Sequence, residues 1–181
     1  MHHTLPFYSK NRESFLRYYI FQASWTKIPL IGSLVRMVAN SYGKKQSAAY
    51  LLTLEEANEI VDSSEMLALG PCACRTVFKN CDNSINTEIM VGMGRSAFID
   101  ERPGDYREIT REEAKEILQE CHAKGLIHTI IKWHHNFYAI CNCCSCCCVP
   151  LRLRKHYGIG NALVRSGDIV EQFRKQQLSH A

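Results

Sequence analysis

The sequence predicts an α+β fold in which amphipathic helices pack beside a β-hairpin. Thr53 and Glu56, and again Thr110 and Glu113, have the spacing of a capping box at a helix N-terminus. Each of these segments runs into a short apolar stretch, "MLALGPCAC" or "GLIHTIIKW", which indicates a strand. The second stretch leads through residues 134–136 into "FYAICNC", so two antiparallel strands joined by a tight turn are expected.

The remaining elements flank this centre. Residues 11–40 are rich in aromatic and aliphatic side chains and predict two short helices that break near Pro29. From about Cys146 the pattern becomes helical, with Pro150 acceptable only in a first turn. The tail "DIVEQFRKQQLSHA" predicts a closing surface helix.

The chain divides into a helical N-terminal docking segment, residues 1–48, and a cysteine-rich domain, residues 49–181. Basic residues are interspersed among the apolar side chains of residues 11–40. This mixture suits peripheral contact with a membrane, docking on a partner protein, or packing on the chain's own domain.

Composition limits the classes of function. Apolar residues make up 46% and charged residues 22%, which allows a buried core, and the net charge of +4 by itself indicates neither nucleic acid nor a membrane. The N-terminus lacks the apolar region of a signal peptide and no window is apolar enough to span a membrane, so a cytoplasmic location is expected. Ten cysteines in such a chain favour metal or redox chemistry over disulfides.

Nine of the cysteines are the candidate metal ligands, and they fall into two stretches of sequence. The stretch "CACRTVFKNC" contains Cys72, Cys74 and Cys81, and the stretch "CNCCSCCC" contains Cys141, Cys143, Cys144, Cys146, Cys147 and Cys148. Cys121 stands alone on the apolar face of a predicted helix, where a buried and inert thiol is expected.

Three explanations of the cysteine-rich stretches compete. Adjacent cysteines form a disulfide only through a strained ring, and a reducing compartment disfavours one. A structural zinc site needs four ligands, and nine thiols exceed one tetrahedron. A 4Fe–4S cube also takes four thiolates, so two cubes would use eight of the nine, or one non-cubane cluster could bridge the two stretches.

Other polar residues near the cysteines are weaker candidates. Five cations lie close to them in sequence and are either stabilisers of a negatively charged cluster or ordinary surface charges: Arg75, Lys79, Arg152, Arg154 and Lys155. Four histidines between the two stretches are minor candidates for ligation: His122, His128, His134 and His135.

The segments "GPCACRTVFKNCDN", "GLIH" and "FYAICNCCSCCC" resemble a family of anaerobic iron–sulfur proteins described as 4Fe–4S binding or ferredoxin-like, over about residues 50–165. The resemblance implies a small helix-plus-hairpin domain built around iron–sulfur clusters. Members of that family commonly continue into a ferredoxin module with C-x-x-C repeats, and this sequence has none. A separate redox partner, ferredoxin-type or part of a larger oxidoreductase complex, is therefore expected.

Electron transfer within a redox assembly is the leading prediction of function. The alternatives are an iron–sulfur enzyme acting on a disulfide or sulfur substrate, and a zinc-binding structural protein. A winged-helix DNA reader is disfavoured because the helix before Gly125 is acidic, so no nucleic-acid partner is expected. Common catalytic motifs are missing, and Gly92 and Gly94 lack a third glycine and a flanking strand, which leaves enzyme status open.

Overall fold

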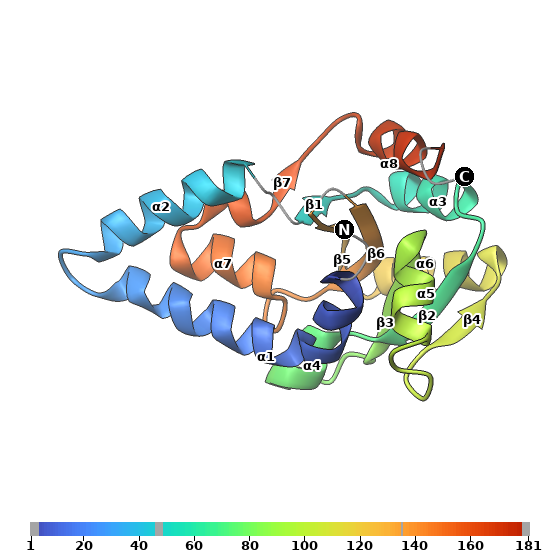
Figure 1. Cartoon of the computed structure of the whole chain (residues 1–181), viewed down its shortest axis with the longest axis horizontal. Helices are drawn as coiled ribbons and strands as arrows, with labels where there is room; N and C mark the ends of the chain where they lie inside the picture. The colour runs from blue at the N-terminus through green and yellow to red at the C-terminus, as the bar shows by residue number, and fades with distance from the viewer. Residues whose placement is uncertain (1–3, 46–48, 135, 179–181) are drawn as a thin grey trace.

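The computed structural model describes residues 4–45, 49–134 and 136–178 (Figure 1). These residues contain a seven-stranded sheet of order β4-β2-β3-β6-β5-β1-β7, in which neighbours are antiparallel except for the parallel pair β1 and β7. The strands are β1 Ala49–Leu51, β2 Leu67–Pro71, β3 Asn86–Val91, β4 Arg107–Ile109, β5 Ile127–Trp133, β6 Asn136–Cys143 and β7 Val164–Arg165. The α+β class is confirmed, and the sheet extends well beyond the predicted hairpin of β5 and β6.

Helices cover the sheet and extend from it. They are α1 Thr4–Ser24, the short 3-10 helix η1 Trp25–Lys27, α2 Gly32–Lys45, α3 Leu54–Asp62, α4 Ala73–Phe78, α5 Met93–Ile99, α6 Arg111–Ala123, α7 Val149–Tyr157, the 3-10 helix η2 Gly160–Ala162 and α8 Ile169–Leu178. The predicted break near Pro29 is confirmed. Both helices around it are longer than expected.

Local sequence signals account for several of these boundaries. Thr53 and Glu56 form the complete capping box of α3, and at the start of α6 the Thr110 side chain accepts a hydrogen bond from the backbone N–H three residues later. Pro150 lies in the first turn of α7, as expected. The strand predicted over "MLALGPCAC" is shorter than expected, because β2 ends at Pro71 and α4 begins two residues later.

Strand alternation gives the sheet two apolar faces, each covered by a different set of helices. Leu69, Ile89 and Ile140 belong to a core that includes side chains of α3, α6 and α8. The neighbouring Met90 and Ala139 belong to the opposite core, which includes side chains of α1 and α5. The cysteines of β6 therefore take their positions from a strand that is buried on both faces.

The glycine pair in "VGMGRS" has a structural role, and the predicted lack of a flanking strand is wrong. Strand β3 ends at Val91, directly before Gly92, and α5 begins at Met93. Gly92 has a φ of +52°, a conformation that the strand-to-helix turn requires and that glycine adopts without strain. At Gly94 a Cβ would collide with the carbonyl oxygen of Tyr138, so glycine lets α5 lie against β6.

The N-terminal segment has two parts with different surroundings. The first half of α1 packs on the domain, where Tyr8 stacks on Trp133 with ring centroids 4.2 Å apart. The second half of α1, η1 and α2 form a helical hairpin that projects away from the sheet (Figure 1). The described part of the chain has no helix that is both long and apolar enough to cross a membrane.

Candidate metal centre

Four cysteines converge beside the sheet, and we call them the four-thiol group: Cys81, Cys144, Cys146 and Cys147. Their sulfur atoms all lie within 4.8 Å of one another, and the described residues include no second set of three or more candidate ligands that is as compact. Cys81 Sγ lies 3.6 Å from Cys144 Sγ and 3.8 Å from Cys147 Sγ. Four convergent sulfurs at these distances can hold a metal ion.

The other five candidate cysteines form a looser set, which we call the five-thiol group: Cys72, Cys74, Cys141, Cys143 and Cys148. Cys143 lies within hydrogen-bonding reach of Cys141 and Cys148, and Cys148 also reaches Cys74. Cys72 lies close enough to Cys74 and Cys143 to interact with their charges. All of these thiols are buried except Cys74, which is partly exposed.

Strand alternation at the end of β6 explains the division. Cys141 and Cys143 are two residues apart, so both face the core of α1 and α5. Cys144, the next residue, belongs instead to the apolar cluster that contains Cys147 and Leu126. One short stretch of sequence therefore supplies thiols to both groups.

Arg75 lies between the two groups, and it is only 2% exposed. Its guanidinium lies beside Cys144 of the four-thiol group and near Cys72 and Cys143 of the five-thiol group. The same guanidinium donates to the carbonyl oxygen of Asn142, which fixes it in place. A buried cation held beside both groups would stabilise negative thiolate charge.

Cys81 carries an acidic thiol in the four-thiol group. Burial raises the pKa of Cys81, but hydrogen bonds from Asn83 and neighbouring thiols outweigh it and lower the pKa to about 6. By contrast, burial raises the pKa of Cys146 to about 11 and that of Cys147 to about 12. Without metal, Cys81 is therefore a thiolate at neutral pH, and metal binding would release protons from Cys146 and Cys147.

In the five-thiol group, Cys143 is the thiol with the lowered pKa. The thiols of Cys141 and Cys148 beside it hold the pKa of Cys143 well below its ordinary value, although the residue is buried. Thr129 Oγ1 also lies 3.4 Å from Cys143 Sγ. Hydrogen bonding with Cys143 raises the pKa of Cys148. Each group thus combines one thiol of lowered pKa with others of raised pKa, such as Cys147 and Cys148, which would lose their protons when a metal binds.

Cys141 differs from the other thiols because a buried carboxylate accepts its hydrogen bond. Its Sγ lies 3.2 Å from Glu88 Oε1. Glu88 in turn forms an ion pair with Arg12 of α1, with 2.6 Å between Nη2 and Oε2 and both side chains almost completely buried. Contact with Cys143, burial and the charge of Glu88 hold the pKa of Cys141 above its ordinary value. A chain of polar contacts therefore links the N-terminal helix to the five-thiol group.

Cys121 is buried, as expected. It lies on α6 and packs beside Cys144 and Cys147, but it is not a member of the four-thiol group. Burial raises its pKa, which suits an inert apolar neighbour of the group.

The described histidines lie outside both thiol groups. His128 is buried, with Nδ1 2.6 Å from Asn142 Oδ1 and Nε2 3.4 Å from His122 Nδ1. His134 is exposed at the hairpin turn, where its φ is +54°. His135 lies outside the described residues.

The other predicted cations have different surroundings from Arg75. Arg152 lies over the ring of an α4 phenylalanine, 4.5 Å from its centroid, and Arg154 donates to a backbone carbonyl oxygen at 2.6 Å. Lys79 is exposed at the C-terminal cap of α4, and Lys155 lines a groove at the helical hairpin.

The sequence patterns did not point to several residues that contact the thiol groups. Asn83 donates a side-chain hydrogen bond to Cys81 Sγ at 3.5 Å, and the backbone N–H of Asn80 donates to Cys147 Sγ at 3.3 Å. Both flank the cysteine of "KNCDN", and amides beside a candidate ligand are a usable signal. Nothing in the sequence connects Arg12 with Glu88, because 76 residues separate them.

The donor set fits a metal bound by thiolates. Around one tetrahedral ion with metal–sulfur bonds of about 2.3 Å, sulfurs lie about 3.8 Å apart. The distances of 3.6 and 3.8 Å in the four-thiol group match this spacing. In a 4Fe–4S cube each thiolate binds a different iron, which suits a looser arrangement such as the five-thiol group.

The fold and the thiol geometry define a candidate metal-binding protein. No family model, curated protein or solved structure matches the chain. The resemblance of its two cysteine motifs to iron–sulfur proteins therefore remains a prediction.

Proposed function

We propose that this protein binds metal in both thiol groups, with at least one 4Fe–4S cluster, and transfers electrons between redox proteins. The observation that carries the proposal is the division of nine cysteines into sets of four and five, because each set can supply the four thiolates of one centre. A thiolate-bound iron–sulfur cluster exchanges single electrons with a partner.

Hydrogen-bond donors and charge around the sulfurs support the proposal. The backbone N–H groups of Asn80 and Val149 and the side-chain amide of Asn83 point at cysteine sulfurs, at 3.3 to 3.5 Å. Together with Arg75 they would stabilise the reduced, more negative state of a cluster and raise its reduction potential.

Exposure favours the four-thiol group as the exit for electrons. Two of its four thiols, Cys81 and Cys146, are partly exposed, whereas in the five-thiol group only Cys74 is. A centre near the surface can face a redox partner, and an interior centre can relay to it. The partner proposed is a ferredoxin-type protein or a larger oxidoreductase complex.

Cys141 is the surplus thiol in this proposal. A metal-bound Cys141 would be a thiolate 3.2 Å from the Glu88 carboxylate, so two negative charges would meet in a buried space. The remaining eight thiols supply two complete sets of four, with Cys72 and Cys74 completing the set around Cys143 and Cys148.

The test is metal analysis of anaerobically purified protein. Two 4Fe–4S clusters would give about eight irons and eight acid-labile sulfides per chain. Cys143→Ser and Cys144→Ser should each lose the content of one centre, while Cys141→Ser and Cys121→Ser should keep the wild-type content. Reduced protein should pass electrons to added ferredoxin, followed by visible absorption.

Two results would refute this account in different ways. Protein that contains metal but no acid-labile sulfide would rule out a 4Fe–4S cluster. If Cys141→Ser lost as much iron as Cys143→Ser, the assignment of Cys141 as the surplus thiol would be wrong, although the cluster itself would stand.

A zinc ion in the four-thiol group is the second candidate, and the sulfur spacing favours it. The 3.6 and 3.8 Å distances match the sulfur spacing around one tetrahedral ion. In that case the group has a structural role. Cys144→Ser would then remove one zinc and leave iron and sulfide unchanged.

A further inference from the structure

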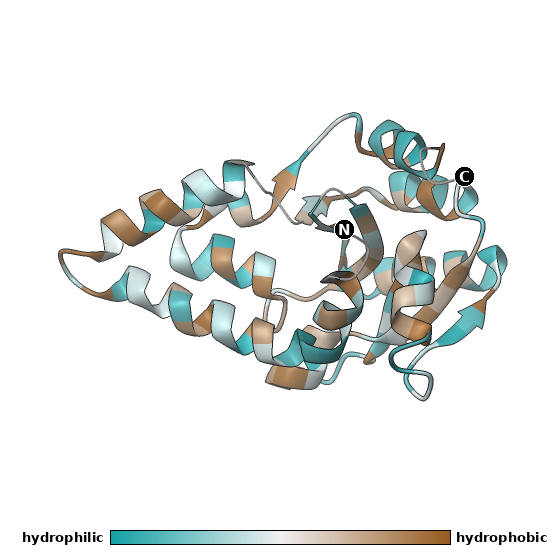
Figure 2. Ribbon diagram, in the orientation of Figure 1, coloured by the Kyte–Doolittle hydropathy of each residue, from teal (hydrophilic) through white to brown (hydrophobic). Residues whose placement is uncertain are grey.

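The tip of the helical hairpin exposes a concentration of large apolar side chains. Leu30, in the turn between η1 and α2, is 98% exposed and has a φ of +71°. Exposed side chains continue from it along both helices: Phe21, Trp25, Ile28, Ile31, Leu34, Met37 and Val38. Figure 2 shows this apolar colour at the end of the molecule farthest from the sheet. Such a surface indicates a binding site.

The charge on the same segment has one sign. Residues 14–54 contain no Asp or Glu, whereas the chain as a whole has 18 acidic residues. The cations of this segment are Arg17, Lys27, Arg36, Lys44 and Lys45. A partner with negative charge fits this surface. If the surface faced only water, nothing would disfavour acidic residues here, and their absence would be a matter of chance.

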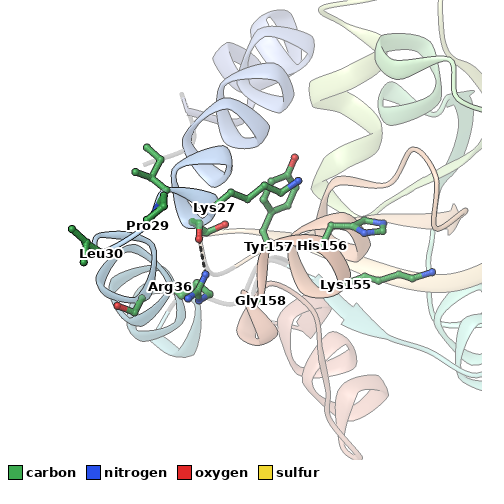
Figure 3. Close-up of a pocket in the computed structure, with 11 residues that line it drawn as sticks. Lys27, Pro29, Leu30, Arg36, Lys155, His156, Tyr157 and Gly158 are labelled. Carbon is green, nitrogen blue, oxygen red and sulfur yellow. Dashed lines mark hydrogen bonds between the residues drawn. The ribbon is translucent and has the colours of Figure 1, made fainter.

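A groove joins the hairpin to the end of α7 and adds basic side chains from a distant part of the sequence (Figure 3). It has a volume of about 690 Å³, and Lys27, Arg36, Lys155 and His156 line it with no acidic residue. Exposed Lys27 and Lys155 come from opposite walls.

The groove is held in shape by contacts between its walls. Arg36 donates to the carbonyl oxygen of Thr26 at 2.6 Å, and Lys27 Nζ lies 4.9 Å from the centre of the Tyr157 ring. Gly158 has a φ of +70°, and a Cβ there would lie 2.8 Å from Arg36 Cδ. The glycine therefore lets the end of α7 approach the arginine closely.

We propose that the helical hairpin docks on an anionic phospholipid membrane, with its apolar tip among the acyl chains and a phosphate-bearing headgroup in the basic groove. Apolar and aromatic side chains beside lysine and arginine are the composition of segments that lie at a membrane interface. The hairpin would hold the thiol groups beside the membrane, where a membrane-bound redox partner could meet them.

The shape of the tip favours a lipid surface over an acidic protein. The exposed apolar side chains continue from the projecting turn along both helices, Phe21 and Trp25 before it and Leu34 after it, and a fluid lipid surface can enclose such a turn without a preformed complementary shape. A protein partner would need a deep apolar pocket with an acidic rim. Protein docking is therefore the competing outcome of the test.

Vesicle cosedimentation tests the proposal with the full, metal-loaded chain. Vesicles of phosphatidylcholine with about one third phosphatidylserine should bind the protein, and phosphatidylcholine alone should bind it much more weakly. Each basic residue near an anionic surface is worth about fivefold in affinity. Lys27→Gln with Lys155→Gln should therefore weaken binding about 25-fold, and added salt should weaken it further.

Matched variants separate docking through the hairpin from non-specific adsorption to vesicles. Leu30→Ser should lower the affinity about tenfold because it removes a leucine from the acyl region. Leu178→Ser, at another exposed leucine on α8, and Lys124→Gln, at the exposed cap of α6, should leave it unchanged. No binding to anionic vesicles at low salt, or equal weakening by the two control variants, would overturn the proposal.

Discussion

Removal of the buried cation Arg12 should destabilise the protein strongly. In the folded protein its guanidinium lies 2.6 Å from a Glu88 carboxylate oxygen, donates to the carbonyl oxygen of Pro71 at 3.1 Å and lies 5.0 Å from the centre of the Phe98 ring. Arg12→Met keeps most of the apolar stem but removes the charge. The Glu88 carboxylate would then be buried without its partner.

The structure sets the size of this effect. At 2.6 Å and an effective dielectric constant of about 20, two unit charges attract by about 6 kcal/mol. Desolvation of both groups cancels part of that attraction, and breaking one partner of a buried pair costs about 3–5 kcal/mol. For a chain of this size such a loss lowers the melting temperature by roughly 6–20 °C.

Urea denaturation, followed by tryptophan fluorescence, measures this loss in proteins of equal metal content. Equal loading matters because bound metal adds stability of its own. Arg174→Met is the matched control, since Arg174 pairs with Glu59 at 2.9 Å on the surface and both side chains are about half exposed. That variant should lose less than about 1 kcal/mol.

A double variant isolates the unpaired charge. Arg12→Met combined with Glu88→Gln removes both charges and should recover about 2 kcal/mol relative to Arg12→Met alone. If Arg12→Met costs no more than Arg174→Met, or if Glu88→Gln recovers nothing, the buried ion pair does not stabilise α1 on the sheet.

Three further predictions concern local features. In metal-free, reduced protein, Cys81 should be the first thiol alkylated by iodoacetamide, as measured by peptide mass mapping. Its rate should rise as the pH passes about 6 and then level off, because only the thiolate reacts. A rate that still climbs near pH 8.5 would contradict the lowered pKa. Gly94→Ala should cost about 1–3 kcal/mol in urea denaturation, because the new Cβ meets the Tyr138 carbonyl oxygen, while Gly104→Ala, with no atom within 4 Å, should cost far less. Thr53→Ala should lose about 1 kcal/mol of stability through the α3 cap, and an unchanged thermal midpoint would show that the capping box contributes nothing.

Sequence patterns predicted the elements with local signals. The capping residues Thr53 and Thr110, the first-turn Pro150 and the β5–β6 hairpin follow from short stretches of sequence, and the structure confirms each of them. Strands β3, β4, β1 and β7 were not predicted. Three of these are at most three residues long, and their positions depend on pairing with distant strands.

The candidate thiols were visible in the sequence, but their grouping was not. The sequence stretches suggest a set of three and a set of six, whereas the fold forms sets of four and five. Cys81 lies apart from Cys72 and Cys74 because α4 and its left-handed cap residue Lys79 carry the chain away from them. The alternation of β6 then separates Cys143 from Cys144.

By itself, the sequence determined that this chain concentrates thiols and that it has an α+β fold, because residue type and short-range periodicity carry that information. Only the tertiary structure decided which thiols meet, that Arg75 lies between the two groups, and that Glu88 and Arg12 engage Cys141. These contacts join residues up to 76 positions apart, and they arise from strand pairing and helix packing over the whole chain.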